Sequence, residues 1–304
     1  MNQQNPYGGQ QPQWGQPQAG GAGWGQQPQQ QQAWGGQPQQ HQQQPQQFGG
    51  MHPGMQVPGQ PQPGPSGGYD ESNMIASEAS VEARSKFIER TYLHLAGAIA
   101  VFVVLTGVLQ YVPAVENLAA AMLGNWWIVL AGFIGVGWIA DRWARGDHSA
   151  GMQYAGLVLY TLAEALIFVP LIMLARAPSL LGIDQEGIGW EGIMTAGGTT
   201  LAMFAGLTAY VFITKKDFSF MRGALAVISM GALGLIVASM AFGFDLGLVF
   251  VVGMVVLAGA YILYYTSNVL HHYRVNQHVA AALALFSALA LLFWYILQLF
   301  MSRR

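Results

Sequence analysis

The sequence contains no cysteine and few charged residues. The absence of cysteine excludes disulfide bonds and thiolate metal sites. Only 9% of the 304 residues are Asp, Glu, Lys or Arg, whereas a soluble domain usually carries about 25%. Because 53% of the residues are hydrophobic, this deficit predicts a membrane protein, with the lipid bilayer as its main partner. The net charge of −2 is too small to favour nucleic acid as a partner.

The first 69 residues lack charge altogether and consist mainly of Gln, Gly and Pro. Such a segment cannot bury enough apolar surface to become ordered, so residues 1–69 are predicted to form a disordered cytoplasmic tail. The polar N-terminus also predicts no cleavable signal sequence. Trp14, Trp24 and Trp34 each precede a Gly at intervals of ten. Sparse aromatic residues in a Gln/Gly background are typical of tails that self-associate weakly, and the spacing also fits a slipped repeat without a role.

A charged segment, residues 70–91, separates the tail from the apolar part of the chain. Within it, residues 76–90 have apolar side chains at helical spacing. We interpret 76–90 as an amphipathic helix on the membrane surface, leading into the first span.

Seven apolar runs between residues 92 and 300 are each long enough to cross a bilayer, which takes ~20 residues. The fold class predicted is therefore an all-α membrane protein with seven transmembrane helices. The predicted spans are about 92–111, 121–140, 152–174, 192–213, 223–242, 246–265 and 279–300.

The basic residues indicate the orientation of these spans. Nine of the 12 Lys and Arg residues fall on the side of the N-terminus if all seven runs cross. That side is predicted to be the cytoplasm, in a bacterial plasma membrane. Arg303 and Arg304 at the chain end disagree with this orientation. An alternative keeps them inside by making the last run re-entrant.

One carboxylate, Glu164, lies near the middle of the third run. A charged side chain there costs at least ~2.5–3.5 kcal/mol, so the carboxyl must be neutral, face a polar cavity, or bind a cation. Tyr160 and Thr161 precede it by about one helical turn and can donate hydrogen bonds. An intramembrane acid favours an ion or proton pathway formed by these three residues, although a neutral Glu that only bonds another helix also fits.

No motif for covalent chemistry is present. The chain lacks a Gly-rich phosphate loop with a Lys, a His-Glu-x-x-His and a Gly-x-Ser-x-Gly motif, so we expect no enzyme and no cofactor. His271, His272 and His278 cluster near the last loop without an acidic partner nearby. They predict a loop that gains charge near pH ~6.5 rather than a metal site.

Several segments resemble the Bax inhibitor-1 family of transmembrane proteins. The stretch "TAYVFITKKDFSFMRGAL" is similar to a family signature in which a polar loop joins two spans. "LYTLAEAL" resembles the third-span pattern of the family, and "GAYILYYTSNVL" resembles its sixth span. The loop motif itself comprises Thr214, Lys215, Lys216, Asp217 and Phe218.

This resemblance implies seven helices with the last one central, and a calcium or proton leak across the membrane. In eukaryotes it also implies restraint of cell death. The family typically has two Asp residues that form a pH-sensitive gate, and the corresponding positions here hold Tyr265 and Ala288. Paired carboxylates have coupled pKa values, and that chemistry is absent from this chain.

Two functions therefore remain open. One is a passive cation pathway, for calcium or protons, with altered or lost gating. The other is a non-conducting membrane scaffold that docks partners through its tail and regulates membrane-protein turnover or stress tolerance.

Overall fold

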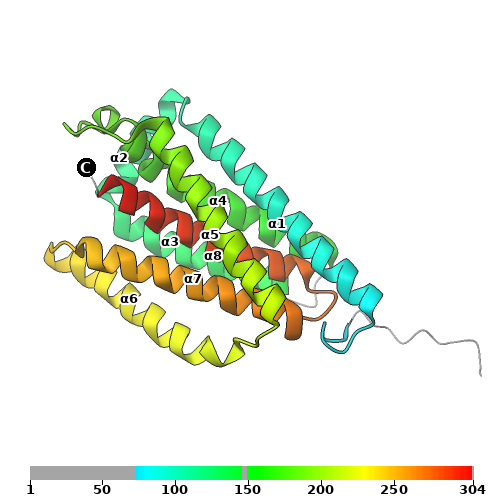
Figure 1. Cartoon of the computed structure of the whole chain (residues 1–304). Helices are drawn as coiled ribbons and strands as arrows, with labels where there is room; N and C mark the ends of the chain where they lie inside the picture. The colour runs from blue at the N-terminus through cyan, green and yellow to red at the C-terminus, as the bar shows by residue number, and fades with distance from the viewer. Residues whose placement is uncertain (1–72, 146–148, 303–304) are drawn as a thin grey trace, which may run out of the picture. The chain divides into compact units, whose positions relative to one another are not determined.

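The described residues of the computed structural model, 73–145 and 149–302, form a bundle of helices without any β-strand (Figure 1). The predicted tail lies outside these residues. Among the described residues, seven helices are long and apolar enough to cross a membrane. The elements are α1 (Val81–Leu109), α2 (Pro113–Gly124), α3 (Trp126–Arg145), α4 (Ala150–Arg176), η2 (Pro178–Leu181), α5 (Gly189–Thr214), η3 (Ser219–Met221), α6 (Arg222–Phe242), α7 (Gly247–His271) and α8 (His278–Met301).

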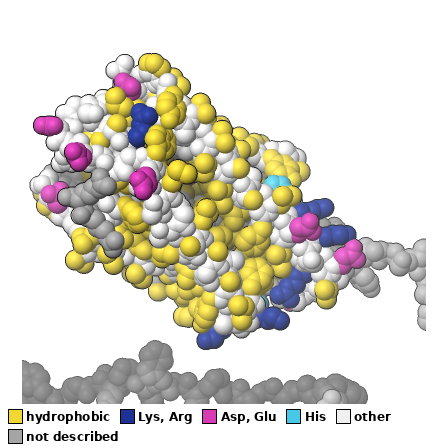
Figure 2. Space-filling view, turned by 45° about the horizontal axis from the view of Figure 1, so that its top comes forward, with side chains coloured by type: hydrophobic (Ala, Val, Ile, Leu, Met, Phe, Trp, Pro, Cys, Tyr) yellow, Lys and Arg dark blue, Asp and Glu magenta, His cyan; other side chains and the backbone are white. Residues whose placement is uncertain are grey.

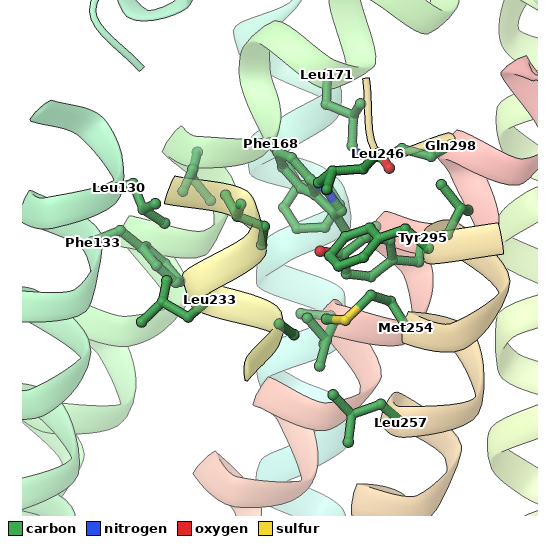
Figure 3. A pocket seen from close by; sticks show the side chains of 18 of the residues that line it. Leu130, Phe133, Phe168, Leu171, Leu233, Leu246, Met254, Leu257, Tyr295 and Gln298 are labelled. Atoms are coloured by element: carbon green, nitrogen blue, oxygen red, sulfur yellow. The ribbon is translucent and has the colours of Figure 1, made fainter. Parts of the chain in front are cut away.

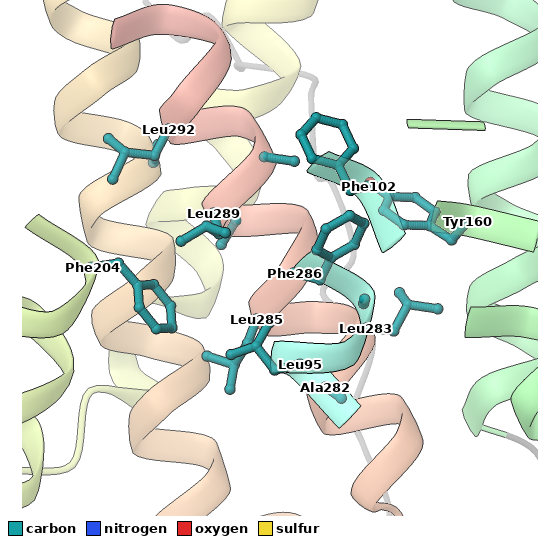
Figure 4. Packing of buried hydrophobic residues seen from close by; sticks show 14 of the residues in the cluster. Leu95, Phe102, Tyr160, Phe204, Ala282, Leu283, Leu285, Phe286, Leu289 and Leu292 are labelled. Carbon is teal, nitrogen blue, oxygen red and sulfur yellow. The ribbon is translucent and has the colours of Figure 1, made fainter. Parts of the chain in front are cut away.

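The last helix, α8, lies in the centre of the bundle, which confirms the predicted architecture. It packs against α1, α3, α4, α5 and α7, and 78% of its most apolar stretch of 18 residues is buried. Its many alanines allow neighbouring helices to approach closely. Phe286 of α8 packs edge-to-face against Phe102 of α1, while Phe204 of α5 approaches from the other side (Figure 4). α8 is one continuous helix of 24 residues, which is long enough to cross a bilayer.

The second most buried helix, α4, packs closely on α3 through a glycine. A Cβ atom at Gly156 would lie 2.6 Å from the backbone oxygen of Ala140. Only glycine permits this approach without a shift of one helix. The contact fixes α4 against α3 and so sets the position of Glu164.

In contrast, α6 is peripheral. It packs mainly against α7, and only two of its side chains, Leu225 and Ala232, are buried. The turn between α6 and α7 is short because Gly243 and Gly247 adopt positive φ angles of 69° and 71°. This turn brings the two helices together as the predicted tight hairpin.

The N-terminal part of the bundle differs from the expected helix bounds in two places. The segment expected as an amphipathic surface helix leading into the first span, 76–90, is continuous with that span from Val81, where α1 begins, and α1 runs unbroken to Leu109. Ser80 caps this helix by accepting a hydrogen bond from the Ala83 amide. The second expected span, 121–140, includes residues of a further short helix, α2, which begins at Pro113 and is too short to cross a bilayer.

Residues just before α1 are tied to the loop between α7 and α8. The Ala76 amide donates to the Tyr273 carbonyl over 2.8 Å, and the Val275 amide donates to the Met74 carbonyl over 3.0 Å. Together these bonds fix the start of the bundle to the loop that leads into its central helix.

Charged side chains gather at the two ends of the bundle, with an apolar belt between them (Figure 2). Lys and Arg dominate the end that holds the start of α1 and the α5–α6 loop. Acids dominate the other end: Glu116, Asp184, Glu186, Glu191 and Asp245. Arg176 lies at this acidic end, over the rings of Tyr111 and Trp190.

Candidate functional site

Glu164 lies halfway along α4 and is only 5% exposed. Its carboxyl lies beside the hydroxyl of Tyr160, one turn earlier on the same helix. Tyr160 in turn lies beside Ser287 of the central helix and close to Tyr265 of α7. The acid therefore sits where α4, α7 and α8 meet.

These polar groups form the floor of a cavity of about 1080 Å³. Ser229 of α6 and Tyr261 of α7 complete the floor, and their hydroxyl oxygens are 2.8 Å apart. We call Glu164, Tyr160, Ser229, Tyr261, Tyr265 and Ser287 the polar floor.

The cavity walls above the polar floor are apolar. Side chains from α3, α4, α6, α7 and α8 point into the same space, among them Phe133, Leu233 and Met254 (Figure 3). The cavity reaches the surface at the acidic end of the molecule, where Asp245 and Ser302 line it. A small cation at this mouth meets a field that favours positive charge.

On the side away from the mouth, aromatic and charged groups lie beyond the polar floor. Tyr265 stacks on Tyr261 with ring centroids 5.5 Å apart. Arg145, at the end of α3, lies near Tyr265 and Tyr273 and is paired with Asp141 over 2.6 Å. Burial raises the pKa of Tyr273 to about 12, so this phenol stays neutral at physiological pH. These groups separate the floor from the basic end of the bundle.

Thr161, expected to act with Glu164 and Tyr160, does not line the cavity. Its hydroxyl donates to the Leu157 carbonyl of its own helix over 2.8 Å. Such a bond is a common fate of threonine inside an apolar helix. The structure thus brings Glu164 and Tyr160 together at the floor and leaves Thr161 in a structural position.

The loop motif 214–218 lies at the basic end, away from the cavity. Lys215 ends α5 in a left-handed conformation with φ 51°. The Asp217 carboxylate accepts hydrogen bonds from the Ser219 amide over 2.8 Å and from the Ser267 hydroxyl over 3.2 Å, and it lies 3.0 Å from a ring nitrogen of His272. Partial burial opposes ionisation, but the bonds from Ser219 and His272 outweigh it and lower the pKa of Asp217 to about 2. The motif therefore ties the α5–α6 loop to the end of α7.

The three histidines near the last loop do not gather around one point. His272 contacts Asp217, whereas His278 packs against the rings of His94 and Tyr154 with centroids 5.1 and 6.4 Å away. Within 73–145 and 149–302, no three His, Asp or Glu side chains come together as ligands for a metal.

Comparison with known proteins decides the family. A model of the family described as "Inhibitor of apoptosis-promoting Bax1" matches residues 84–304. The chain belongs to the Bax inhibitor-1 family.

Relatives of this Bax inhibitor-1 family member occur in bacteria and in yeast. An uncharacterised protein of Pseudomonas aeruginosa is 28% identical over 235 residues, which cover 76% of this chain and 95% of that protein. An uncharacterised protein of Pasteurella multocida is 28% identical over 224 residues, covering 72% and 91%. Bax inhibitor 1 of Schizosaccharomyces pombe is 27% identical over 229 residues, covering 73% and 79%.

In this Bax inhibitor-1 family member, the two positions expected to hold gate acids both line the cavity. Tyr265 belongs to the polar floor, and Ala288 lies beside Ser287 on the central helix. Both face the same space as Glu164. The cavity thus contains one acid at its floor where a family member with both Asp residues would hold three.

Sequence reasoning missed part of the polar floor. Nothing in the sequence marks Tyr261, Ser229 or Ser287 as members of one site. Ser287 donates to the Ala284 carbonyl over 2.8 Å, a bond within its own helix, whereas Ser229 pairs with Tyr261 across two helices. The sequence shows only that all three residues lie within predicted spans.

Proposed function

We propose that this Bax inhibitor-1 family member forms a passive pathway for cations, calcium or protons, with Glu164 as its intramembrane ligand or proton acceptor. The observation that carries the proposal is the burial of Glu164 at the polar floor of a cavity that reaches the acidic end of the bundle. A buried acid in a membrane is costly and typically functional. The acidic mouth raises the local concentration of cations, and the hydroxyl groups of the floor offer oxygen ligands.

The proposed pathway lacks a pH gate of the paired-aspartate kind. Tyr265 and Ala288 cannot share a proton between carboxylates. The rate of conduction is therefore set by how closely the aromatic side chains beyond the polar floor pack together, rather than by titration of an acid pair.

In the proposed orientation, the N-terminus and the basic end face the cytoplasm of a bacterial plasma membrane. The segregation of Lys and Arg to that end of the described bundle supports this orientation. The cavity then opens on the outside, and the groups near Arg145 separate it from the cytoplasm.

The test is ion flux in liposomes that contain a calcium dye and a pH dye. Wild type, Glu164→Gln and empty vesicles are compared between about pH 6 and pH 8. Glu82→Gln is the matched control, because Glu82 is an exposed glutamate on α1. We expect Glu164→Gln to lower influx about tenfold or more, since the lost charge is a ligand in a low-dielectric site. Glu82→Gln retains wild-type influx.

A second candidate, the non-conducting scaffold, is favoured by the absence of both gate acids and by the apolar walls, because apolar cavities stay dry. Wild-type influx equal to that of empty vesicles at every pH would replace the cation pathway with this scaffold. Attention would then move to proteins that bind the tail.

A further inference from the structure

The cavity has a side opening toward the membrane. Residues of both α3 and α6 line it, yet these two helices do not pack substantially against each other. Leu130 and Phe133 of α3 face the cavity, as does Leu233 of α6 (Figure 3). Their neighbours Ile134 and Leu235 are about half exposed and belong to the apolar belt. The opening between α3 and α6 therefore faces lipid hydrocarbon.

The dimensions of the space suit a hydrocarbon chain. Along α8 the lining extends from Ser287 to Ser302, about 22 Å at ~1.5 Å per residue. The hydrocarbon of one leaflet is about 15 Å deep. Since the apolar walls above the polar floor do not hold water stably, a lipid chain that enters through the side opening can fill the space between them.

The mouth indicates the chemistry of the headgroup. Asp245, Gln298 and Ser302 line the cavity where it reaches the surface, and none of the described lining residues is Lys or Arg. A carboxylate and an amide bind an ammonium group, whereas an anionic phosphate without an amine would meet Asp245 unpaired. The mouth therefore favours a zwitterionic headgroup with an amine.

We propose that the cavity binds one acyl chain of an amine-bearing zwitterionic phospholipid, which enters between α3 and α6 and places its amine beside Asp245. This site does not depend on the proposed cation pathway. It does bear on that pathway, because a bound chain occupies the volume that a hydrated cation needs. The lipid-filled cavity is then a closed state.

The experiment uses the full-length protein in nanodiscs with phosphatidylethanolamine that carries a photoreactive diazirine near the end of one acyl chain. Labelled positions are mapped by peptide mass spectrometry. Met254 and Leu257 of α7 are only 7% and 5% exposed but line the cavity, so a chain reaches them only from inside it. Val256, which is 68% exposed on the same helix and lies between these two positions in the sequence, reports contact with bulk lipid at the same depth. We expect labelling at all three positions.

A matched pair of variants on α6 tests the route of entry. Leu233→Trp fills the side opening, whereas Leu235→Trp adds the same ring on the exposed belt. Labelling of Met254 and Leu257 falls about tenfold in Leu233→Trp, because the added ring removes apolar contacts of the chain. Labelling at Val256 stays unchanged in both variants, and thermal unfolding checks that each protein is folded.

Three results would overturn the proposal. The first is labelling at Val256 with none at Met254 and Leu257 in the wild type. The second is equal labelling of the two buried positions in both tryptophan variants. The third is a preference for photoreactive phosphatidylglycerol or a free fatty acid over phosphatidylethanolamine. Ion flux is not a readout in these assays, so failure of the cation pathway leaves their outcome unaffected.

Discussion

The helices α6 and α8 have similar mean hydropathies but opposite surroundings. The segment 219–242 contains α6, the segment 278–301 forms α8, and each has 24 residues. Their most apolar stretches of 18 residues have mean hydropathies of 2.2 and 2.3. Yet 11% of this stretch is buried in the first segment, against 78% in the second. In a membrane, hydropathy identifies a span but not its partners, because lipid and protein interior are equally apolar.

The two helices differ in the surroundings of their small residues. The buried alanines of α8 lie against α1, α4, α5 and α7, where each larger side chain would push a neighbour away. The glycines of α6, Gly223, Gly231 and Gly234, have open space where a Cβ would lie. Small residues are therefore packing determinants on one helix and are spatially unconstrained on the other.

The largest expected effect comes from enlarging a buried alanine of the central helix. Ala281 is 0% exposed, so Ala281→Leu overpacks α8 and lowers the free energy of unfolding by about 2–3 kcal/mol. The apparent Tm in detergent falls by about 4–12 °C. The matched change Ala226→Leu on the exposed face of α6 stays within about 0.5 kcal/mol of wild type. Equal losses in both variants would mean that the contrast between the two helices does not govern stability.

A smaller effect is expected at the close contact between α3 and α4. Gly156→Ala places a methyl group 2.6 Å from the Ala140 oxygen and costs about 1–2 kcal/mol as the helices separate. Gly234→Ala on α6 meets nothing within 4 Å, and it raises stability by up to about 1 kcal/mol through helix propensity. Thermal unfolding of the two variants side by side measures the difference. A stable Gly156→Ala protein would show that α3 and α4 are free to shift apart.

The smallest effect is expected at Asp217, which links the α5–α6 loop to the end of α7. Because the folded pKa of Asp217 is about 2 and an unfolded aspartate titrates near ~3.9, its stabilisation is complete above pH ~4 and is lost as pH falls toward 2. The side chain is 47% exposed, so solvent screening limits the contribution to at most about 1 kcal/mol.

Asp217→Asn removes this contribution. The Tm of the variant therefore declines less than that of wild type between about pH 4 and about pH 2. Thermal unfolding over a pH series provides the measurement. Identical pH profiles would show that the bonds to Ser219 and His272 do not stabilise the ionised carboxylate in solution.

The number of spans followed from the sequence because apolar runs of sufficient length have few alternatives. The centres of all seven runs also lie in the matching helices, but several ends differ. The first helix, α1, begins 11 residues before the predicted span, and α3 and α7 reach Arg145 and His271, five or six residues beyond the predicted ends. The central place of α8 came from the family resemblance, since its hydropathy does not distinguish it from α6. The short helix α2 was missed because its residues were divided between a connection and a span.

The candidate site was only partly predictable. Glu164 is conspicuous because an acid inside an apolar run is costly, and its helical neighbour Tyr160 follows from spacing. Partners such as Ser287 and Tyr261 come from other helices and need tertiary contacts to be assigned. The cavity itself depends on the gap between α3 and α6, and pair packing in a membrane leaves little trace in a single sequence.

The depth of Glu164 has an electrical consequence. Its Cα lies 12 residues before the end of α4, close to the middle of the span. Moving one elementary charge across the whole membrane potential is worth about 2.3 kcal/mol per 100 mV. A cation that travels from the mouth of the cavity to Glu164 crosses about half of that field. A potential of ~100 mV therefore changes its binding free energy at Glu164 by about 1 kcal/mol, which is roughly a sixfold change in affinity. In the proposed orientation, an inside-negative potential draws cations toward this acid, and binding there becomes voltage-dependent without any charged helix having to move.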